Sequence, residues 1–163
     1  MVLVITAYYS YFSLSSIKFM NTKKLMMMVL LMAASVGAFA QKNDDIVGKW
    51  LNATGEGQIF IYKKADKYFG KLGWIKFPND ENGKAKTDVK NPDPTLRSRP
   101  ELNLELLKNF TYNDGTYVDG TIYDPKSGKT YSCKMTLKGN VLKVRGYIGI
   151  SLLGRTEVFT RVK

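Results

Sequence analysis

The stretch from Thr130 to Tyr147, TYSCKMTLKGNVLKVRGY, predicts the fold more clearly than any other part of the sequence. Its first half, Thr130–Lys138, alternates apolar and polar side chains, which is the pattern of a β-strand with one buried face. The residues expected on that face are Tyr131, Cys133, Met135 and Leu137. The pair Gly139-Asn140 is a two-residue turn signal, and a second β-type run, Val141–Tyr147, follows it. The stretch therefore predicts an antiparallel β-hairpin.

Shorter runs of the same type recur along the chain between turn signals such as Asp124–Gly128. Further strands are expected at Ile46–Asn52, Gln58–Lys64, Tyr68–Lys76, Thr116–Tyr123 and Thr156–Val162. Only Glu101–Asn109 has a helical pattern, and only for a turn or two. We predict an all-β fold, a small antiparallel up-and-down barrel of about seven to eight strands, because closure removes the open edges of a sheet. A barrel of this size can be filled or hollow, and we expect it to be filled.

A long loop separates the two β-rich halves of the chain. It contains Thr87–Pro100, TDVKNPDPTLRSRP, in which the prolines exclude a regular helix or a central strand. Loops of this length are uncommon in small domains unless they are disordered or have a function. Arg97 and Arg99 could clamp a carboxylate or phosphate group of a ligand. In the alternative interpretation, these arginines fix the loop internally through Asp88, Asp93 or backbone carbonyl groups.

The first part of the chain has the features of a targeting segment. Residues 20–40 begin with lysines, continue with an apolar run that is too short to span a membrane, and end in small side chains. We interpret them as a signal peptide cleaved between Ala40 and Gln41, and residues 1–19 as an upstream extension from a start codon assigned too early. An uncleaved amino-terminal anchor is the alternative. The mature chain, residues 41–163, would be a single domain, periplasmic or secreted, without a transmembrane span.

Composition excludes several classes of site. The chain has no histidine and one cysteine, so it has no Ser-His-Asp or Cys-His machinery and no histidine-rich zinc or copper site. No acidic spacing of a calcium loop is present, and we expect neither metal nor cofactor. Alternation buries Cys133, which favours a packing role over a reactive thiol. The formal net charge of +11 favours anionic partners, but export argues against nucleic acid.

Several segments resemble the bacterial exported family known as domain of unknown function 2147. They are Ile46–Trp50, the Thr87–Pro100 loop, Ile122–Pro125 with Gly128–Tyr131, and Leu142–Gly146 with Leu153–Thr156. The resemblance covers residues 44–163 and implies a small barrel of the lipocalin-like kind without an assigned activity. The chain departs from the family pattern at Glu101 and Cys133.

The segment Gly48-Lys49-Trp50 is similar to the G-x-W start of lipocalins. This likeness implies that Trp50 packs under an arginine of the last strand and closes the base of the barrel. The arginine would be Arg161 or, as the alternative, Arg155. Gly48, Trp50 and Arg161 are therefore expected to be structural.

The leading functional hypothesis is a non-enzymatic binding module that holds a small anionic or amphipathic molecule of the cell envelope. The candidate ligand-binding residues are Arg97, Arg99, Asp88, Asp93, Tyr123, Tyr131, Arg145 and Arg155. The second hypothesis is a structural or interaction protein that contacts another envelope protein through the loop and the apolar connection Gly146–Gly154. A hydrolase with paired carboxylates is third, because no spacing among the acids selects a pair. The acids available to it are Asp88, Asp93, Asp124 and Glu157.

The barrel interior separates the first two hypotheses. A cavity of at least about 300 Å³ with arginines at its mouth would favour ligand binding. A core filled by Trp50, Phe60 and Phe159 would favour the interaction protein. In either case we expect a monomer, because a closed barrel has no free edge for pairing with a second copy.

Overall fold

The computed structural model describes residues 23, 26–27 and 44–163. The chain forms two units, Met1–Ala40 and Gln41–Lys163, and every strand described below belongs to the second. The predicted upstream extension, signal peptide and cleavage site lie outside the described residues, apart from three positions of the leader. Within the described part of the chain, no helix has both the length and the apolar character needed to cross a membrane.

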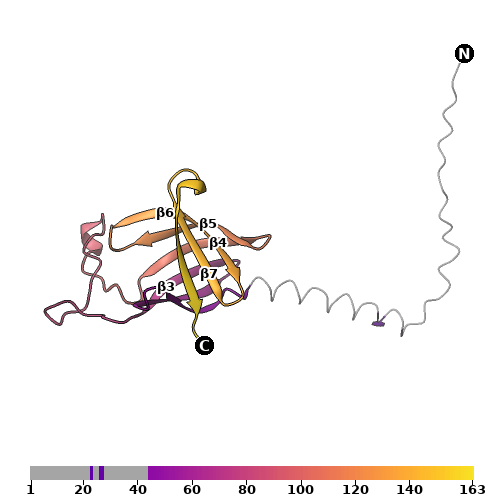
Figure 1. The fold of residues 1–163 in the computed structure, drawn as a ribbon, viewed down its shortest axis with the longest axis horizontal. Coiled ribbons are helices and arrows are strands. Elements are labelled where there is room, and N and C mark those ends of the chain that lie inside the picture. The colour runs from indigo at the N-terminus through magenta and orange to yellow at the C-terminus, as the bar shows by residue number, and fades with distance from the viewer. Residues whose placement is uncertain (1–22, 24–25, 28–43) are drawn as a thin grey trace, which may run out of the picture. The chain divides into compact units, whose positions relative to one another are not determined.

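The second unit is a closed antiparallel barrel of eight strands in which each strand pairs with its neighbour in sequence (Figure 1). The strands are β1 (Gly48–Asn52), β2 (Gly57–Lys64), β3 (Lys67–Ile75), β4 (Glu105–Asn113), β5 (Thr116–Asp124), β6 (Lys129–Lys138), β7 (Val141–Tyr147) and β8 (Arg155–Arg161). Pairing of β1 with β8 closes the barrel. The predicted all-β barrel is confirmed, and the Gly139-Asn140 hairpin joins β6 to β7 as expected.

The helix predicted for Glu101–Asn109 is wrong, because most of that segment belongs to strand β4. Strand β4 does not alternate regularly, since Leu107 and Phe110 are both buried although they are three positions apart. The register explains this spacing: Leu107 pairs with Gly70 and Phe110 with Tyr68, so β4 has one more residue than β3 between the two pairs. A bulged strand therefore has a spacing that imitates a helix. The described helical turns lie elsewhere, at η2 (Pro94–Leu96) and η3 (Ser151–Leu153).

The two ends of the barrel differ. We call the end with the tight turns at residues 65–66, 114–115 and 139–140 the closed end. Its interior is packed with side chains that are all buried, namely Ile46, Trp50, Ile61, Tyr68, Phe110, Tyr117, Cys133, Met135 and Leu142. The other end, which we call the open end, has the longer segments 53–56, 76–104, 125–128 and 148–154.

Trp50 and Arg161 lie together at the closed end, and the contact implied by the G-x-W start is present. The guanidinium carbon of Arg161 is 4.2 Å from the centre of the fully buried Trp50 ring, and the indole Nε1 donates to the carbonyl of Ile46 at 2.8 Å. Arg161 also donates to the carbonyls of Asp45 and Val47, which ties the incoming chain across the barrel base. A Cβ at Gly48 would lie 3.0 Å from Arg161 Nη1, and the φ of Gly48 is +140°, so this position requires glycine.

Candidate functional site

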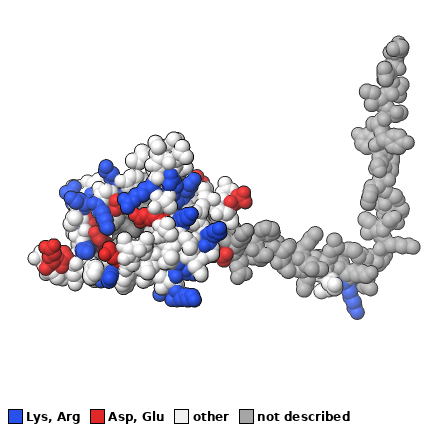
Figure 2. Space-filling view, in the orientation of Figure 1, with Lys and Arg blue, Asp and Glu red and all other residues white. Residues whose placement is uncertain are grey.

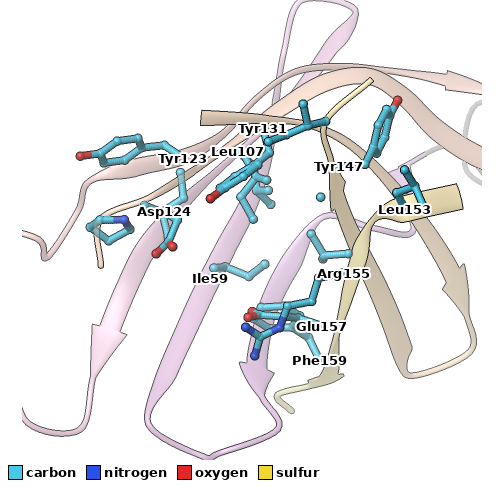
Figure 3. A pocket seen from close by; sticks show the side chains of 16 residues that line it. Ile59, Leu107, Tyr123, Asp124, Tyr131, Tyr147, Leu153, Arg155, Glu157 and Phe159 are labelled. Carbon is cyan, nitrogen blue, oxygen red and sulfur yellow. The ribbon is translucent and has the colours of Figure 1, made fainter. Parts of the chain in front are cut away.

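The open end of the barrel is hollow. A cavity of about 630 Å³ is lined mainly by apolar side chains, and an adjoining lobe of about 590 Å³ shares part of its wall (Figure 3). The apolar residues common to both lobes are Ile59, Leu106, Pro125 and Phe159. The expectation of a filled interior is therefore wrong for this half of the barrel. The volume is in the usual range for sites that bind small molecules.

The apolar wall follows from strand alternation. Ile59 on β2, Leu107 on β4, Ile122 on β5 and Val144 on β7 all line the cavity. Beyond Val144 the next inward position on β7 is Gly146, where an added Cβ would lie 3.2 Å from Ile122 Cγ2, so this glycine lets the Ile122 side chain pack against the β7 backbone. The inward faces of these strands therefore give the cavity an apolar wall.

Two charged side chains of β8 also line the cavity. Arg155 and Glu157 precede the buried Phe159 by four and two positions, so all three share the inward face of the strand. Neither charged group has a hydrogen-bond or ion-pair partner among residues 44–163, and both remain open to solvent. Figure 3 shows them beside Phe159, with the cavity in front of them. An arginine and a carboxylate in an apolar hollow are groups that a polar ligand could satisfy.

Asp124 and Tyr131 add polar groups from other strands. Asp124, at the end of β5, accepts from the Lys126 backbone N–H at 3.0 Å and from Ser127 Oγ at 2.7 Å, and its side chain borders both lobes. Tyr131 on β6 reaches into the cavity in Figure 3. The mouth of the cavity therefore presents hydrogen-bonding groups together with both signs of charge.

The outer lobe has the same mixed character. Lys86, Glu101 and Lys126 line it together with the acids of the inner cavity. Burial, together with the nearby Asp88, raises the pKa of Glu101, while the two lysines act in the opposite direction. Figure 2 shows basic and acidic side chains next to each other on the displayed face. This end of the barrel is thus not a basic clamp.

The long loop is held by one buried carboxylate. Asp88 is fully buried and accepts from Tyr123 Oη at 2.6 Å, from Asn91 Nδ2 at 2.7 Å and from Arg99, whose Nη2 and Nε lie 2.7 and 3.0 Å away. Burial by itself would raise the pKa of Asp88, but the hydrogen bonds from Tyr123, Asn91 and Arg99 outweigh it and lower the pKa below its ordinary value. These bonds attach the loop to β5.

Arg97 and Asp93 also have partners inside the loop. Arg97 Nε donates to the carbonyl of Asn91 at 2.8 Å. Asp93 caps η2 by accepting from the Thr95 backbone N–H at 2.9 Å and hydroxyl at 2.7 Å, and these bonds lower its pKa. Arg99 is thus bound to Asp88, and the Nε of Arg97 to the Asn91 carbonyl, both within their own loop. The internal-tie interpretation describes the geometry.

Comparison with known proteins agrees with this architecture. A family model described as an uncharacterized protein conserved in bacteria (DUF2147) matches residues 48–161, from the first strand to the last. The chain belongs to this family. No curated protein matches it.

Among solved structures, this DUF2147 chain is similar to protein HP1028 from the human pathogen Helicobacter pylori, which is described as belonging to the lipocalin family. The likeness covers 73% of this chain and 84% of HP1028, with a TM-score of 0.62 and 22% sequence identity. At this identity the likeness concerns the fold, and the expected lipocalin-like barrel is confirmed.

The structure separates the candidate ligand-binding residues of this DUF2147 chain into two groups. Tyr131 and Arg155 point into the cavity. Tyr123 borders the cavity, but its ring turns away from the space and its hydroxyl binds Asp88 (Figure 3). Arg145 lies outside the barrel wall and donates to Ser151 O, Leu152 O and Thr156 Oγ1.

Sequence reasoning named Asp124 and Glu157 only as acids without a pattern, and it did not select Ile122. Glu157 had one usable signal, because it alternates with Arg155 and Phe159 on a strand whose inward face could be inferred from Arg161. Asp124 was expected at the start of a turn, where alternation does not predict which way a side chain points, and the structure makes it the last residue of β5. Its position at the cavity depends on barrel closure.

Cys133 is fully buried, and burial raises the pKa of its thiol to about 12, in agreement with the packing role predicted for it. Across residues 44–163 and the described leader positions, histidine, cysteine and acidic side chains form no group suited to holding a metal ion. The hollow open end is therefore the best candidate site of this chain.

Proposed function

We propose that this barrel binds a small amphipathic molecule in its open end and does not act as an enzyme. The observation that carries the proposal is the apolar cavity of about 630 Å³ with Arg155 and Glu157 on its wall. The apolar part of the ligand would lie between Ile59, Ile122 and Val144. Its polar group would meet Arg155, Glu157 and Tyr131.

The contrast in packing supports this proposal. Protein interiors are normally close-packed. The side chains around an empty apolar cavity lack the van der Waals contacts that a filled core would give them. The chain buries the core side chains of the closed end and leaves the large apolar cavity at the open end. A ligand would restore the missing contacts.

The charges around the cavity favour one of the two expected ligand classes. Asp124 and Glu157 line the same cavity as Arg155, and a purely anionic ligand would meet two carboxylates for one guanidinium. An amphipathic molecule whose polar group carries donors as well as acceptors, or charges of both signs, fits this arrangement better. We therefore propose an amphipathic rather than a simple anionic ligand.

We further propose that the mature protein works outside the cytoplasm, as a monomer without nucleic-acid partners. The support is the signal-peptide pattern of residues 20–40, with cleavage between Ala40 and Gln41. Closure of the sheet by β1 and β8 leaves no strand edge for pairing with a second copy. The ligand would then be a molecule of the cell envelope.

Filling the cavity tests the proposal. Titration with the neutral fluorescent amphipath N-phenyl-1-naphthylamine should show saturable binding to the wild type, and Ile122→Trp should weaken it at least about tenfold by occupying the space. Thr136→Trp adds the same side chain at an exposed position of β6 and should leave binding unchanged. Equal binding by all three proteins, or none by the wild type, would contradict the proposal. Native mass spectrometry of protein recovered without detergent should in addition retain a small molecule on the wild type only.

A further inference from the structure

The connection between β7 and β8, residues 148–154, places a cluster of large apolar side chains in solvent. Ile148 is 74% exposed, Ile150 61%, Leu152 81% and Leu153 80%. Isolated apolar residues on a surface are ordinary, but a contiguous group of them marks an interaction site. The connection does not close the cavity: Ile148 and Leu153 line its rim, and all four side chains remain largely exposed.

The backbone of the connection is held firmly although its side chains are exposed. Arg145 Nε donates to Ser151 O at 2.7 Å and Arg145 Nη2 to Leu152 O at 2.9 Å, and Lys134 Nζ contacts Ser151 Oγ at 3.3 Å. A Cβ at Gly154 would lie 2.6 Å from the carbonyl oxygen of Gly146, so the chain presses closely on the end of β7. These contacts fix the backbone of the connection and leave its apolar side chains exposed.

Basic side chains surround the foot of the connection. Lys134 and Arg145 are register partners on β6 and β7, and Arg145 pairs with Thr156, next to Arg155, on β8. Figure 2 shows the connection, at the top of the view in Figure 1, as an uncharged projection above a band of basic side chains with acidic side chains between them. An apolar tip above a basic band is the arrangement that binds the surface of an anionic bilayer.

We propose that residues 148–154 dock the barrel on a bilayer that contains anionic phospholipid. Ile150 and Leu152 enter the boundary between headgroups and acyl chains, and the positive charges of Lys134 and Arg145, which keep their contacts with the connection, attract the lipid phosphates. The charge complementarity decides between this partner and a protein groove, because an apolar protein groove would not require a band of basic residues below the tip.

Docking in this way would bring the cavity to the membrane. Ile148 and Leu153 belong both to the exposed tip and to the cavity wall, so the mouth of the cavity opens beside the docked surface. This part of the inference rests on the proposed function: an amphipathic ligand would pass between bilayer and cavity without crossing water. The docking itself does not depend on a ligand.

Vesicle flotation of residues 41–163 tests the docking, because this segment contains all eight strands and the β1–β8 pairing that closes the barrel. Phosphatidylcholine vesicles with about 30 mol % phosphatidylglycerol should bind the wild type. Binding should fall at least about threefold without the anionic lipid or in about 0.5 M NaCl, where charges are screened. The double variant Ile150→Ser with Leu152→Ser should lower binding at least about tenfold.

A matched control replaces two exposed apolar residues at the closed end, Val47→Ser with Val141→Ser, and should leave vesicle binding unchanged. Ile150 and Leu152 do not line the cavity, so their double variant should still bind N-phenyl-1-naphthylamine. Loss of vesicle binding with retained probe binding supports the docking independently of the proposed function. Equal flotation of the wild type and the Ile150/Leu152 variant overturns it. So does a wild type that ignores vesicles and instead binds an envelope protein through Ile150 and Leu152.

Discussion

The closed and open ends of this barrel are built from the same eight strands but differ in what fills them. At the closed end Trp50, Phe110 and Met135 lie in a core without solvent access, and Arg161 stacks on the outer side of the indole ring. At the open end the same strands enclose a cavity of about 630 Å³ that contains the side chains of Arg155 and Glu157. Strand β8 shows the contrast in one element, because Arg161 has three protein partners and Arg155 has none among the described residues.

This difference indicates that the closed end provides stability and the open end provides the candidate site. Close packing and the Arg161 contacts stabilise the closed end. The open end instead obtains its shape from backbone and loop contacts, with Asp88 holding the long loop and Arg145 the β7–β8 connection. A site that must admit a ligand cannot be filled with side chains. The loops around its mouth must therefore be held in place by their own hydrogen bonds.

Truncation at the closed end should have the largest effect. Trp50→Ala removes a fully buried side chain together with the partner of Arg161, and we expect a loss of about 3–5 kcal/mol in the free energy of unfolding. Ile122→Ala at the open end should cost less than about 1.5 kcal/mol, because one side of that residue already faces the cavity. Urea denaturation of both variants provides the measurement. Similar losses would show that the two ends are not packed differently.

Loss of the loop anchor should have an intermediate effect. Asp88→Asn removes a buried charge that accepts from Tyr123, Asn91 and Arg99, and we expect a loss of about 2–3 kcal/mol. Proteolysis of the loop should accelerate accordingly. Asp93→Asn is the control, because Asp93 is exposed and caps only η2, and its effect should be smaller. If both variants resist protease like the wild type, Asp88 does not anchor the loop.

The same carboxylate should give a defined pH dependence. Because the folded state lowers the pKa of Asp88 below its ordinary value of 3.8, its contribution to stability is fully present above that pH. The contribution is lost as the pH falls through the lower, folded pKa. The difference in unfolding free energy between wild type and Asp88→Asn should therefore be constant near neutral pH and shrink below about pH 3.8. A difference that stays constant in acid would contradict the assigned pKa direction.

Removing a charge from the open end should have the smallest effect on stability. Glu157→Leu replaces a hydrated carboxylate without a partner among the described residues, and the unfolding free energy should change by less than about 1 kcal/mol. Thermal or urea unfolding measures the change, with Glu157→Gln as the control for charge alone. A large loss would mean that Glu157 has a structural partner and that the open end is not a free binding surface.

Much of the barrel could be predicted from local patterns. Strand β6 follows strict alternation, and Cys133, Met135 and the Gly139-Asn140 turn lie where the pattern placed them. Strand β4 could not be predicted in this way, because the bulge that brings Leu107 and Phe110 to the same side exists only when β4 pairs with β3. Pairing between distant segments is not recorded in local spacing.

The candidate site was harder to predict for a related reason. Arg97 and Arg99 stood out in the sequence as neighbouring cations in a stiff loop, but their partners Asn91 and Asp88 are in the same loop and occupy them. Arg155 and Glu157 have no such neighbours, and their position at a cavity follows only from the closure of eight strands. Whether a charged side chain is available to a ligand therefore depends on contacts that exist only in the folded chain.

The order of polar and apolar side chains was sufficient to determine the class of this protein, because strand alternation and turn chemistry act over a few residues. It also determined the family and the residues that close the barrel base, since Gly48, Trp50 and Arg161 keep a recognisable spacing. Only the tertiary structure decided which end is hollow and which arginine is free. The cavity volume and the pairing of charged side chains depend on residues from several strands, so neither can be predicted from one segment of the chain.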